Sequence, residues 1–183
     1  MEVSGVVLWM GAGGDGEIYA RLADLLRAEY GLETLPRMER DERGKPWFPD
    51  RPALHFNVSH SGGLLLCGAG EAPLGVDVER VRPRRAGLAR YVLGEGEFQW
   101  YQDRGSRWDV LYSLWTLKEA RCKCTGEGLR RPPKDIAVPL LEPGEAGELE
   151  GLYFRAYGGD GWRAAVCSAG ERPPRLADMP ENI

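Results

Sequence analysis

The sequence predicts an α+β fold, in which helices are combined with mostly antiparallel strands. Three observations lead to this prediction. Apolar residues recur at helical spacing between residues 17 and 30, apolar and polar residues alternate in several short segments, and glycine pairs separate neighbouring segments of that kind. Strands joined by such tight turns pair antiparallel, and their mixture with helices defines the class.

The chain begins with a predicted strand over residues 3–10 and a helix over 17–30, which Gly31 ends. The helix is indicated by four apolar positions that share one face: Ile18, Leu22, Leu25 and Leu26. The glycine-rich run 11–16 lacks the Lys-Ser/Thr ending of a P-loop and the spacing of a dinucleotide site, which argues against a phosphate loop.

A hairpin follows in the first half. Leu54, Phe56 and Val58 alternate with polar residues, so this segment is a strand with one buried face. The pair Gly62-Gly63 forms the turn into the apolar strand 64–69.

The second half is predicted to hold both helices and strands. Asp109 is expected to cap the longest helix, which ends at Cys124. The tail from Gly170, rich in proline, is expected to be poorly ordered. The remaining elements are a strand at 75–81, short helices at 84–91 and 97–102, and strands at 136–140, 149–157 and 162–168, the last two joined by the turn 158–161.

The composition limits the classes of function that the chain can have. The 183 residues carry a net charge of only −4, so the field of the whole molecule does not indicate nucleic-acid binding. No apolar run of about 18 residues and no basic leader occur, which favours a cytoplasmic protein without a membrane segment. The four cysteines lack zinc-site spacing and are expected to be buried as small apolar residues in a reducing compartment.

Two segments carry carboxylates in a pattern that suits a metal. In the strand 75–79, Asp77 and Glu79 share one face, roughly 7 Å apart, while the valines face the other way. In the helix, Glu119 and Lys123 stand four residues apart, with Trp115 one turn earlier. Carboxylates suit Mg²⁺, although the same patterns occur in ordinary solvated strands and helix surface pairs.

A third polar segment lies at the predicted end of the first hairpin strand. Ser59, His60 and Ser61 stand where side chains and free amides can bind an anion, or where they serve turn formation. A Ser-His hydrolase is disfavoured, because adjacent residues of a strand point apart.

Four motifs in this order resemble the Sfp-type 4′-phosphopantetheinyl transferases over residues 32–168. They are Gly-Lys-Pro at 44–46, Phe-Asn-Val-Ser-His-Ser at 56–61, Gly-Val-Asp-Val-Glu at 75–79 and Trp-Thr-Leu-Lys-Glu-Ala-x-x-Lys at 115–123. The resemblance implies two similar α/β halves in a pseudo-twofold monomer, with the active site between them. The expected division is 1–73 and 74–170, followed by a tail at 171–183.

The resemblance also implies the reaction. The 4′-phosphopantetheine group of coenzyme A moves to a serine of an apo acyl carrier or peptidyl carrier protein, and adenosine 3′,5′-bisphosphate leaves. Three carboxylates would hold Mg²⁺: Asp77, Glu79 and Glu119. Glu119 is the candidate acceptor of the serine proton, and Lys123 would contact the diphosphate.

The same resemblance implies that Lys45, Ser59 and His60 contact the coenzyme A phosphates, including the 3′-phosphate. The first half is shorter than is usual in the family, so Arg21, Arg37 and Arg40 are candidate substitutes for its missing basic residues. Two alternatives remain open at this point: a non-catalytic relative that binds coenzyme A or a carrier protein, and an unrelated metal-dependent phosphohydrolase.

Overall fold

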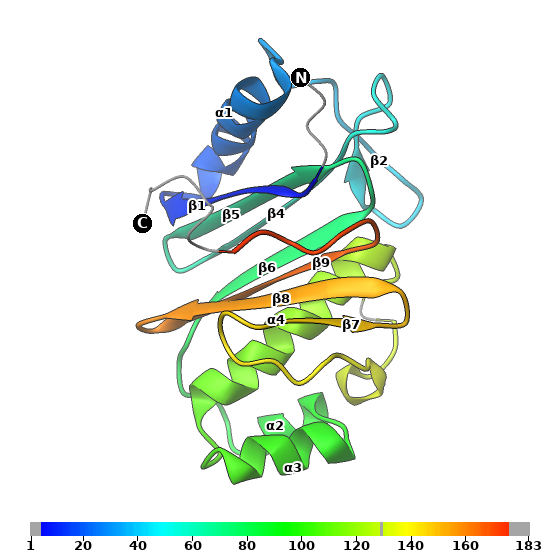
Figure 1. Cartoon of the computed structure of the whole chain (residues 1–183). Coiled ribbons are helices and arrows are strands. Elements are labelled where there is room, and N and C mark those ends of the chain that lie inside the picture. Colours follow the sequence, from blue (N-terminus) through cyan, green and yellow to red (C-terminus); the bar gives the residue numbers. More distant parts are fainter. Residues whose placement is uncertain (1–4, 129, 176–183) are drawn as a thin grey trace.

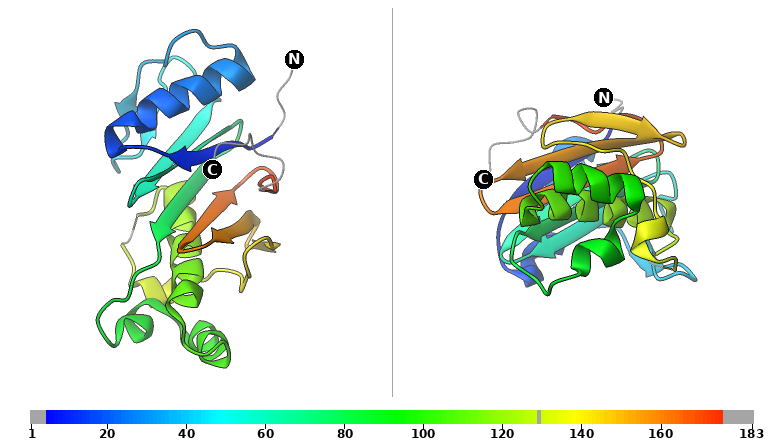
Figure 2. Two further views of the ribbon diagram at one scale, coloured as in Figure 1. Left: turned by 90° about the vertical axis from the view of Figure 1, so that its left-hand side faces the viewer. Right: turned by 90° about the horizontal axis from the view of Figure 1, so that it is seen from below.

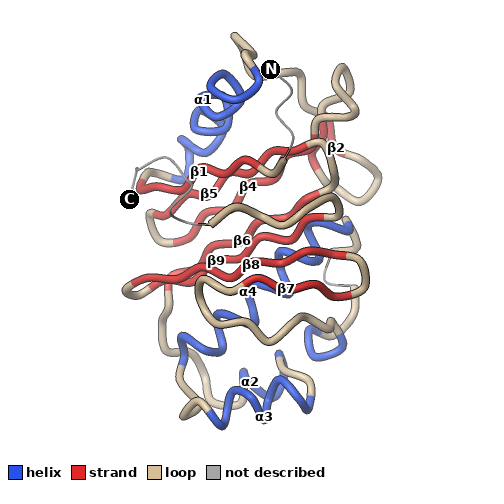
Figure 3. The backbone as a smooth tube through the Cα atoms, in the orientation of Figure 1, coloured by secondary structure: helices blue, strands red, loops and turns tan. Residues whose placement is uncertain are grey.

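The computed structural model describes residues 5–128 and 130–175, and it confirms the α+β class. Two antiparallel sheets lie against each other, with one long helix on the outer face of each (Figures 1 and 2). The first sheet has the order β1-β5-β4, and the second has the order β6-β9-β8-β7 (Figure 3).

The elements of the first sheet and its helix are β1 (Val7–Ala12), α1 (Ile18–Tyr30), β4 (His55–Ser61) and β5 (Leu64–Gly70). Those of the second sheet and its helices are β6 (Leu74–Arg80), α2 (Leu88–Val92), α3 (Glu95–Asp103), α4 (Trp108–Thr125), β7 (Ala146–Leu149), β8 (Leu152–Gly159) and β9 (Trp162–Ser168). Smaller elements are the 3-10 turns η1 (Asp15–Glu17) and η2 (Pro133–Asp135), and the short strands β2 (Glu39–Arg40) and β3 (Pro46–Trp47).

The apolar patterns explain the layers. In β5, Leu64 and Leu66 face the second sheet, whereas Leu65 and Cys67 face α1, so both faces of this strand are buried. This arrangement accounts for its uninterrupted apolar run. Four residues of α1 enter the same core as predicted: Ile18, Leu22, Leu25 and Leu26.

Several predicted turns are confirmed. Gly31 ends α1 with φ +64° and donates its N–H to the carbonyls of the last turn. Gly62 and Gly63, with φ of +54° and +81°, form the two-residue turn between β4 and β5. The turn before β9 is also present, since Gly159 pairs with Trp162.

Side chains of β4 join the two sheets along what we call the β4–β6 seam. Backbone N–H groups of β6 donate to polar side chains at every second position of β4. The pairs are Val76 N to Asn57 Oδ1 (2.9 Å), Val78 N to Ser59 Oγ (3.3 Å) and Arg80 N to Ser61 Oγ (3.3 Å). Since β6 is an edge strand of its sheet, these side chains satisfy amides that would otherwise lack a strand partner.

Several predictions about the second half are wrong. Residues 136–140 form no strand, because side chains of α4 take backbone carbonyls that a neighbouring strand would need. Lys118 donates to the carbonyl of Ile136 at 2.5 Å, and Arg121 donates to that of Ala137 at 2.6 Å. Asp109 does not cap α4; it lies in the first turn and accepts hydrogen bonds from Arg107 and Arg163.

The predicted strand 149–157 is two strands. Glu150 and Gly151, with φ of +53° and +75°, form a tight turn that divides β7 from β8. In the predicted tail, the carbonyls of Pro173 and Pro174 accept hydrogen bonds from side chains of β8. Residues 176–183, and Val3 and Ser4 of the first predicted strand, lie outside the described residues.

The four cysteines are free and buried, as predicted. Among the helices that the structure describes, none combines the length and the apolar composition that a membrane crossing requires.

Gly75 allows α4 to lie directly on β6. A Cβ atom at this position would stand 2.1 Å from the carbonyl oxygen of Ala120 and 2.4 Å from the amide nitrogen of Cys124. Both are backbone atoms of the helix, so the clash cannot be relieved by a side-chain rotation. The glycine therefore fixes the distance between the strand and the helix.

We expect Gly75→Ala to destabilise the fold by about 3 kcal/mol or more, because α4 must move away from β6. Thermal or urea unfolding measures this loss. Gly96→Ala is the control, since Gly96 lies in α3 with open space around it and alanine favours a helix. Equal stability of the two variants would contradict the prediction.

Candidate active site

A cavity of about 350 Å³ lies between β4, β6 and α4 and brings together most of the predicted site residues. Its lining includes the predicted carboxylates, the serine, the histidine and the lysine of the helix: Ser59, His60, Asp77, Glu79, Glu119 and Lys123, with Val58 and Trp115. Lys45 lies instead in an adjoining cavity, which shares Glu119 and Lys123 with the first.

The strand and the helix position these side chains as their spacing predicts. Val76 and Val78 enter the core between the sheets, which leaves Asp77 and Glu79 on the face toward α4. On α4, Trp115, Glu119 and Lys123 follow one another by single turns and line the same cavity.

Asp77 is the centre of the polar contacts. Its Oδ1 accepts hydrogen bonds from Lys123 Nζ at 2.7 Å and from Ser59 Oγ at 3.0 Å. Burial raises the pKa of this carboxyl, and the charge of Lys123 opposes the rise. The second oxygen, Oδ2, is buried without a hydrogen-bond partner among the described residues. A buried carboxylate oxygen in this state is suited to a cation.

Lys123 is held by three acceptors. Besides Asp77, its Nζ donates to the carbonyl of Val76 at 3.0 Å and to Ser59 Oγ at 3.2 Å. These contacts fix the ammonium group at the boundary of the two cavities.

Glu79 lies at the other end of the cavity. Its Oε2 accepts a hydrogen bond of 2.7 Å from Ser61 Oγ, so the β4–β6 seam orients this carboxylate as well.

Glu119 has an altered acidity. Burial is the largest cause, and the charges of Asp77 and Glu79 add to it, so that the pKa of Glu119 is raised to about 6 despite the opposing charge of Lys123. A carboxyl with this pKa is half protonated near pH 6 and can take up a proton more readily than an ordinary glutamate.

The donor set fits Mg²⁺ in part. Within the described residues, no group of three or more His, Cys, Asp or Glu side chains lies close enough to form a complete metal site. The predicted ligands Asp77, Glu79 and Glu119 share the cavity without forming a closed cage. Mg²⁺ keeps several waters and shares positions with substrate phosphates, so an open set of oxygens with one unpartnered atom is compatible with it.

Two residues predicted to bind phosphates already have partners. His60 Nδ1 lies 3.1 Å from Asp15 Oδ1. Lys45 Nζ turns inward and donates to the carbonyl of Cys124 at 2.9 Å and to that of Leu74 at 3.5 Å. Burial lowers the pKa of Lys45.

Lys118, next to Glu119 in the chain, does not line the cavity. It is fully buried, and its Nζ donates to Glu97 of α3 and to the carbonyls of Pro133 and Ile136. This ammonium therefore connects α4 with α3 and with the loop at 133–136.

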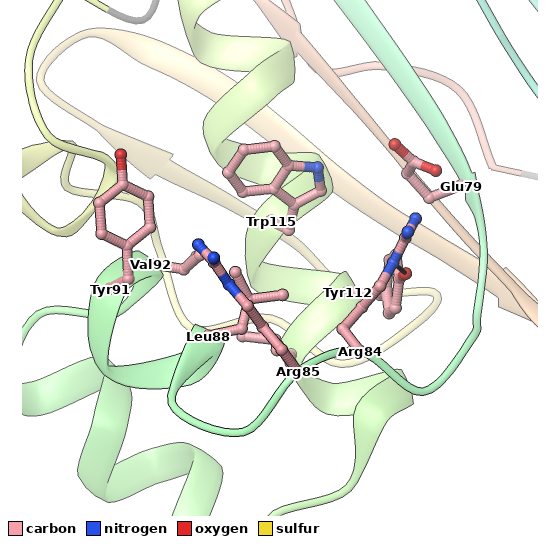
Figure 4. Close-up of a pocket in the computed structure, with 9 residues that line it drawn as sticks. Glu79, Arg84, Arg85, Leu88, Tyr91, Val92, Tyr112 and Trp115 are labelled. Atoms are coloured by element: carbon pink, nitrogen blue, oxygen red, sulfur yellow. Dashed lines mark hydrogen bonds between the residues drawn. The ribbon is translucent and has the colours of Figure 1, made fainter.

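A third cavity, of about 520 Å³, continues on the far side of Glu79 and Trp115. It is a mostly apolar groove between α2 and α4, with two arginines on its rim (Figure 4). Its lining comprises Glu79, Arg84, Arg85, Leu88, Tyr91, Val92, Leu111, Tyr112 and Trp115. Since neighbouring cavities share residues, the three cavities form a continuous row with the carboxylates in the middle.

Sequence reasoning missed several polar residues of the site. Asn57, which binds the backbone of β6, has no predicted role, and Ser61 is predicted only as part of the anion-binding or turn segment, not as the residue that orients Glu79. Their signal is the two-residue spacing with Ser59 along β4. Asp15 approaches His60 through a chain reversal that no local pattern indicated.

Comparison with known proteins identifies the family. The family model described as the 4′-phosphopantetheinyl transferase superfamily matches residues 73–167. The chain is 34% identical to 4′-phosphopantetheinyl transferase Sfp of Bacillus subtilis (strain 168), with 92% of this chain and 75% of the relative covered. It is 35% identical to 4′-phosphopantetheinyl transferase ffp of Bacillus subtilis over the same shares. It is also 31% identical to 4′-phosphopantetheinyl transferase HetI of Nostoc sp. (strain PCC 7120), covering 67% of this chain and 56% of the relative.

The chain therefore belongs to the 4′-phosphopantetheinyl transferase superfamily. Its likeness to Sfp along most of its length makes it an Sfp-type member, as the four motifs predicted. The predicted enzyme class, a phosphopantetheinyl transferase acting on coenzyme A and a carrier protein, is confirmed with it.

The raised pKa of Glu119 predicts that this residue destabilises the metal-free protein above pH 6. A carboxyl whose pKa is higher in the folded state than in the unfolded state stabilises the fold while protonated, below about pH 4.5, and loses that contribution as the pH rises through 6. With a discount for partial exposure, the loss is about 1 kcal/mol.

We therefore expect Glu119→Gln to unfold at a higher temperature than the wild type at pH 8 in the presence of a chelator, by about 2–4 °C. The difference disappears near pH 4.5. Glu42→Gln, at an exposed turn position, is the control and leaves the midpoint unchanged. A variant less stable than the wild type at pH 8 would refute the assigned cause.

Proposed function

We propose that this chain transfers the 4′-phosphopantetheine group in the cavity between β4, β6 and α4. The acceptor is a serine of an apo acyl carrier or peptidyl carrier protein, and adenosine 3′,5′-bisphosphate is the other product. The row of three connected cavities is the observation that carries this proposal, because coenzyme A is itself a molecule in three parts.

The nucleotide end is assigned to the cavity that contains Lys45. This cavity, of about 340 Å³, is lined by basic side chains and by Tyr19, whose ring can stack on a base. The diphosphate then lies in the central cavity, beside Lys123 and the carboxylates. The pantetheine arm extends into the groove between α2 and α4, which is mostly apolar.

The central residues divide the chemistry among them. Asp77, through its unpartnered Oδ2, would hold Mg²⁺ together with Glu79 and Glu119. When bound, the cation neutralises charge on the diphosphate and on the leaving phosphate. Lys123, held by Asp77 and lining both the central cavity and that of Lys45, would supply a fixed positive charge to the diphosphate.

Glu119 is the proposed acceptor of the serine proton, directly or through water. Its side chain lines the central cavity, and its raised pKa brings its proton affinity closer to neutral pH. Ser59 holds Asp77 and Lys123 in place, and His60 approaches the same cavity from the end of β4.

We further infer a pseudo-twofold monomer with halves 1–73 and 74–170. Each half combines an antiparallel sheet with a long helix on its outer face, and the central cavity lies where β4 of one half meets β6 of the other. The tail is proposed to begin at 171, after β9 ends at Ser168.

Asp77→Asn is expected to lower the rate of carrier loading by about 100-fold or more, because it removes the charge that faces the cation. Intact-mass spectrometry of an apo carrier incubated with coenzyme A and Mg²⁺ detects a gain of about 340 Da per transferred group. The wild type loses this gain with a chelator. Asp160→Asn, at an exposed hairpin turn, serves as the control and loads normally.

Retained loading by Asp77→Asn would remove this aspartate from the site. Absence of loading by folded wild-type protein on every acyl and peptidyl carrier tested would instead favour a non-catalytic binding relative. Phosphate release from coenzyme A without a carrier would point to a phosphohydrolase.

Leu88→Trp tests the place of the pantetheine arm. Leu88 lines the groove in Figure 4, and a larger side chain would fill it. We expect the variant to bind coenzyme A about tenfold more weakly and adenosine 3′,5′-bisphosphate, which lacks the arm, as the wild type does. Calorimetric titration of both ligands measures the difference. Equal weakening of the two ligands would place the arm elsewhere.

A further inference from the structure

Two arginines lie beside the cavity that contains Lys45. Arg40 and Arg43 lie at the turn between β2 and β3, and both line this cavity. Neither forms an ion pair with another residue in the part of the chain that the structure describes. Arg37, three residues earlier, is paired with both Glu39 and Asp50.

The other basic groups near the nucleotide end are already occupied. Lys45 Nζ is bound to backbone carbonyls, and Lys123 is paired with Asp77. His60 stands beside Asp15, whose negative charge opposes an approaching phosphate. Arg21, a candidate from the sequence, is paired with Glu17 and is not among the residues that line this cavity.

The turn holds the two arginines in place before any ligand arrives. The side chain of Asp41 accepts hydrogen bonds from the backbone N–H groups of Arg43 and Lys45, both at 2.9 Å. Arg40 Nη1 donates to the carbonyl of Gly44 at 2.8 Å, which fixes its guanidinium along the turn. A guanidinium has five N–H donors, so Arg40 keeps donors for a ligand.

We propose that Arg40 and Arg43 bind the 3′-phosphate of coenzyme A and give this enzyme its preference for coenzyme A over 3′-dephospho-coenzyme A. This inference rests on the proposed function and on its assignment of the nucleotide end. Guanidinium groups bind phosphate through paired, charge-assisted hydrogen bonds. A phosphate bound by Lys45 alone would compete with the carbonyl of Cys124 for the N–H donors of the ammonium group. We therefore assign the 3′-phosphate to Arg40 and Arg43 in place of Lys45 and His60.

The 3′-phosphate leaves with the nucleotide product and takes no part in bond formation. Its contacts are therefore equally strong in the bound substrate and in the transition state. Loss of such contacts raises KM for coenzyme A and leaves kcat unchanged. This pattern separates binding arginines from arginines that act on the reacting phosphorus.

The test is calorimetric titration of the full chain with coenzyme A and with 3′-dephospho-coenzyme A, for the wild type and for Arg40→Gln, Arg43→Gln and the double variant. We expect the double variant to bind coenzyme A about tenfold more weakly and 3′-dephospho-coenzyme A unchanged. Arg51→Gln is the matched control, an exposed arginine nearby that does not line the cavity, and it leaves both affinities unchanged. Circular dichroism verifies that the variants are folded.

Two results would overturn the inference while leaving the proposed function intact: unchanged affinity for coenzyme A in the double variant, or equal losses for the two ligands. Failure of the wild type to bind coenzyme A at all would refute the proposed function, and this inference with it. Steady-state carrier loading by the same variants gives a further check: a lower kcat with unchanged KM for coenzyme A would assign the arginines to the reaction centre and overturn the inference.

Discussion

The β4–β6 seam is the constraint on which the rest of this structure depends. An edge strand of one sheet exposes backbone amides, and an edge strand of the other supplies side-chain acceptors at every second residue. Ser59 and Ser61 each perform a second task, because their hydroxyls also donate to Asp77 and Glu79. The contacts that join the two sheets are thus the same contacts that aim the carboxylates, and a shift between the sheets would move the site with them.

The buried carboxylates of the site lower the stability of the fold. Asp77 is only 5% exposed and retains an oxygen without a described partner, and Glu119 is held where burial and neighbouring negative charge disfavour its ionised form. Lys123 offsets part of this cost by its bond to Asp77. Such unrelieved negative charge favours a divalent cation, so the electrostatics that are unfavourable in the ligand-free protein form the basis of cation binding.

Much of the site follows from local periodicity alone. Alternation along a strand places Asp77 beside Glu79, and helical spacing places Glu119 beside Lys123, whatever the surrounding fold. The orientation of Lys45 could not be predicted in this way, because its acceptors are carbonyls at Leu74 and Cys124, distant in sequence. The wrong prediction of a strand at 136–140 has the same origin. Ile136 and Val138 are buried and alternate as in a strand, but Lys118 and Arg121, which are distant in sequence, bind the carbonyls of Ile136 and Ala137.

Lys118 restrains the elements that surround the groove end of the site. It stands next to Glu119 in the chain, yet its ammonium is anchored in α3 and in the loop at 133–136. An opening of this lower end of the molecule, where α2 forms one wall of the groove, would have to break a buried ionic contact and leave Glu97 without its counter-ion. Separation of α3 and this loop from α4 would leave a buried ammonium and a buried carboxylate unpaired, which disfavours local opening beside the groove.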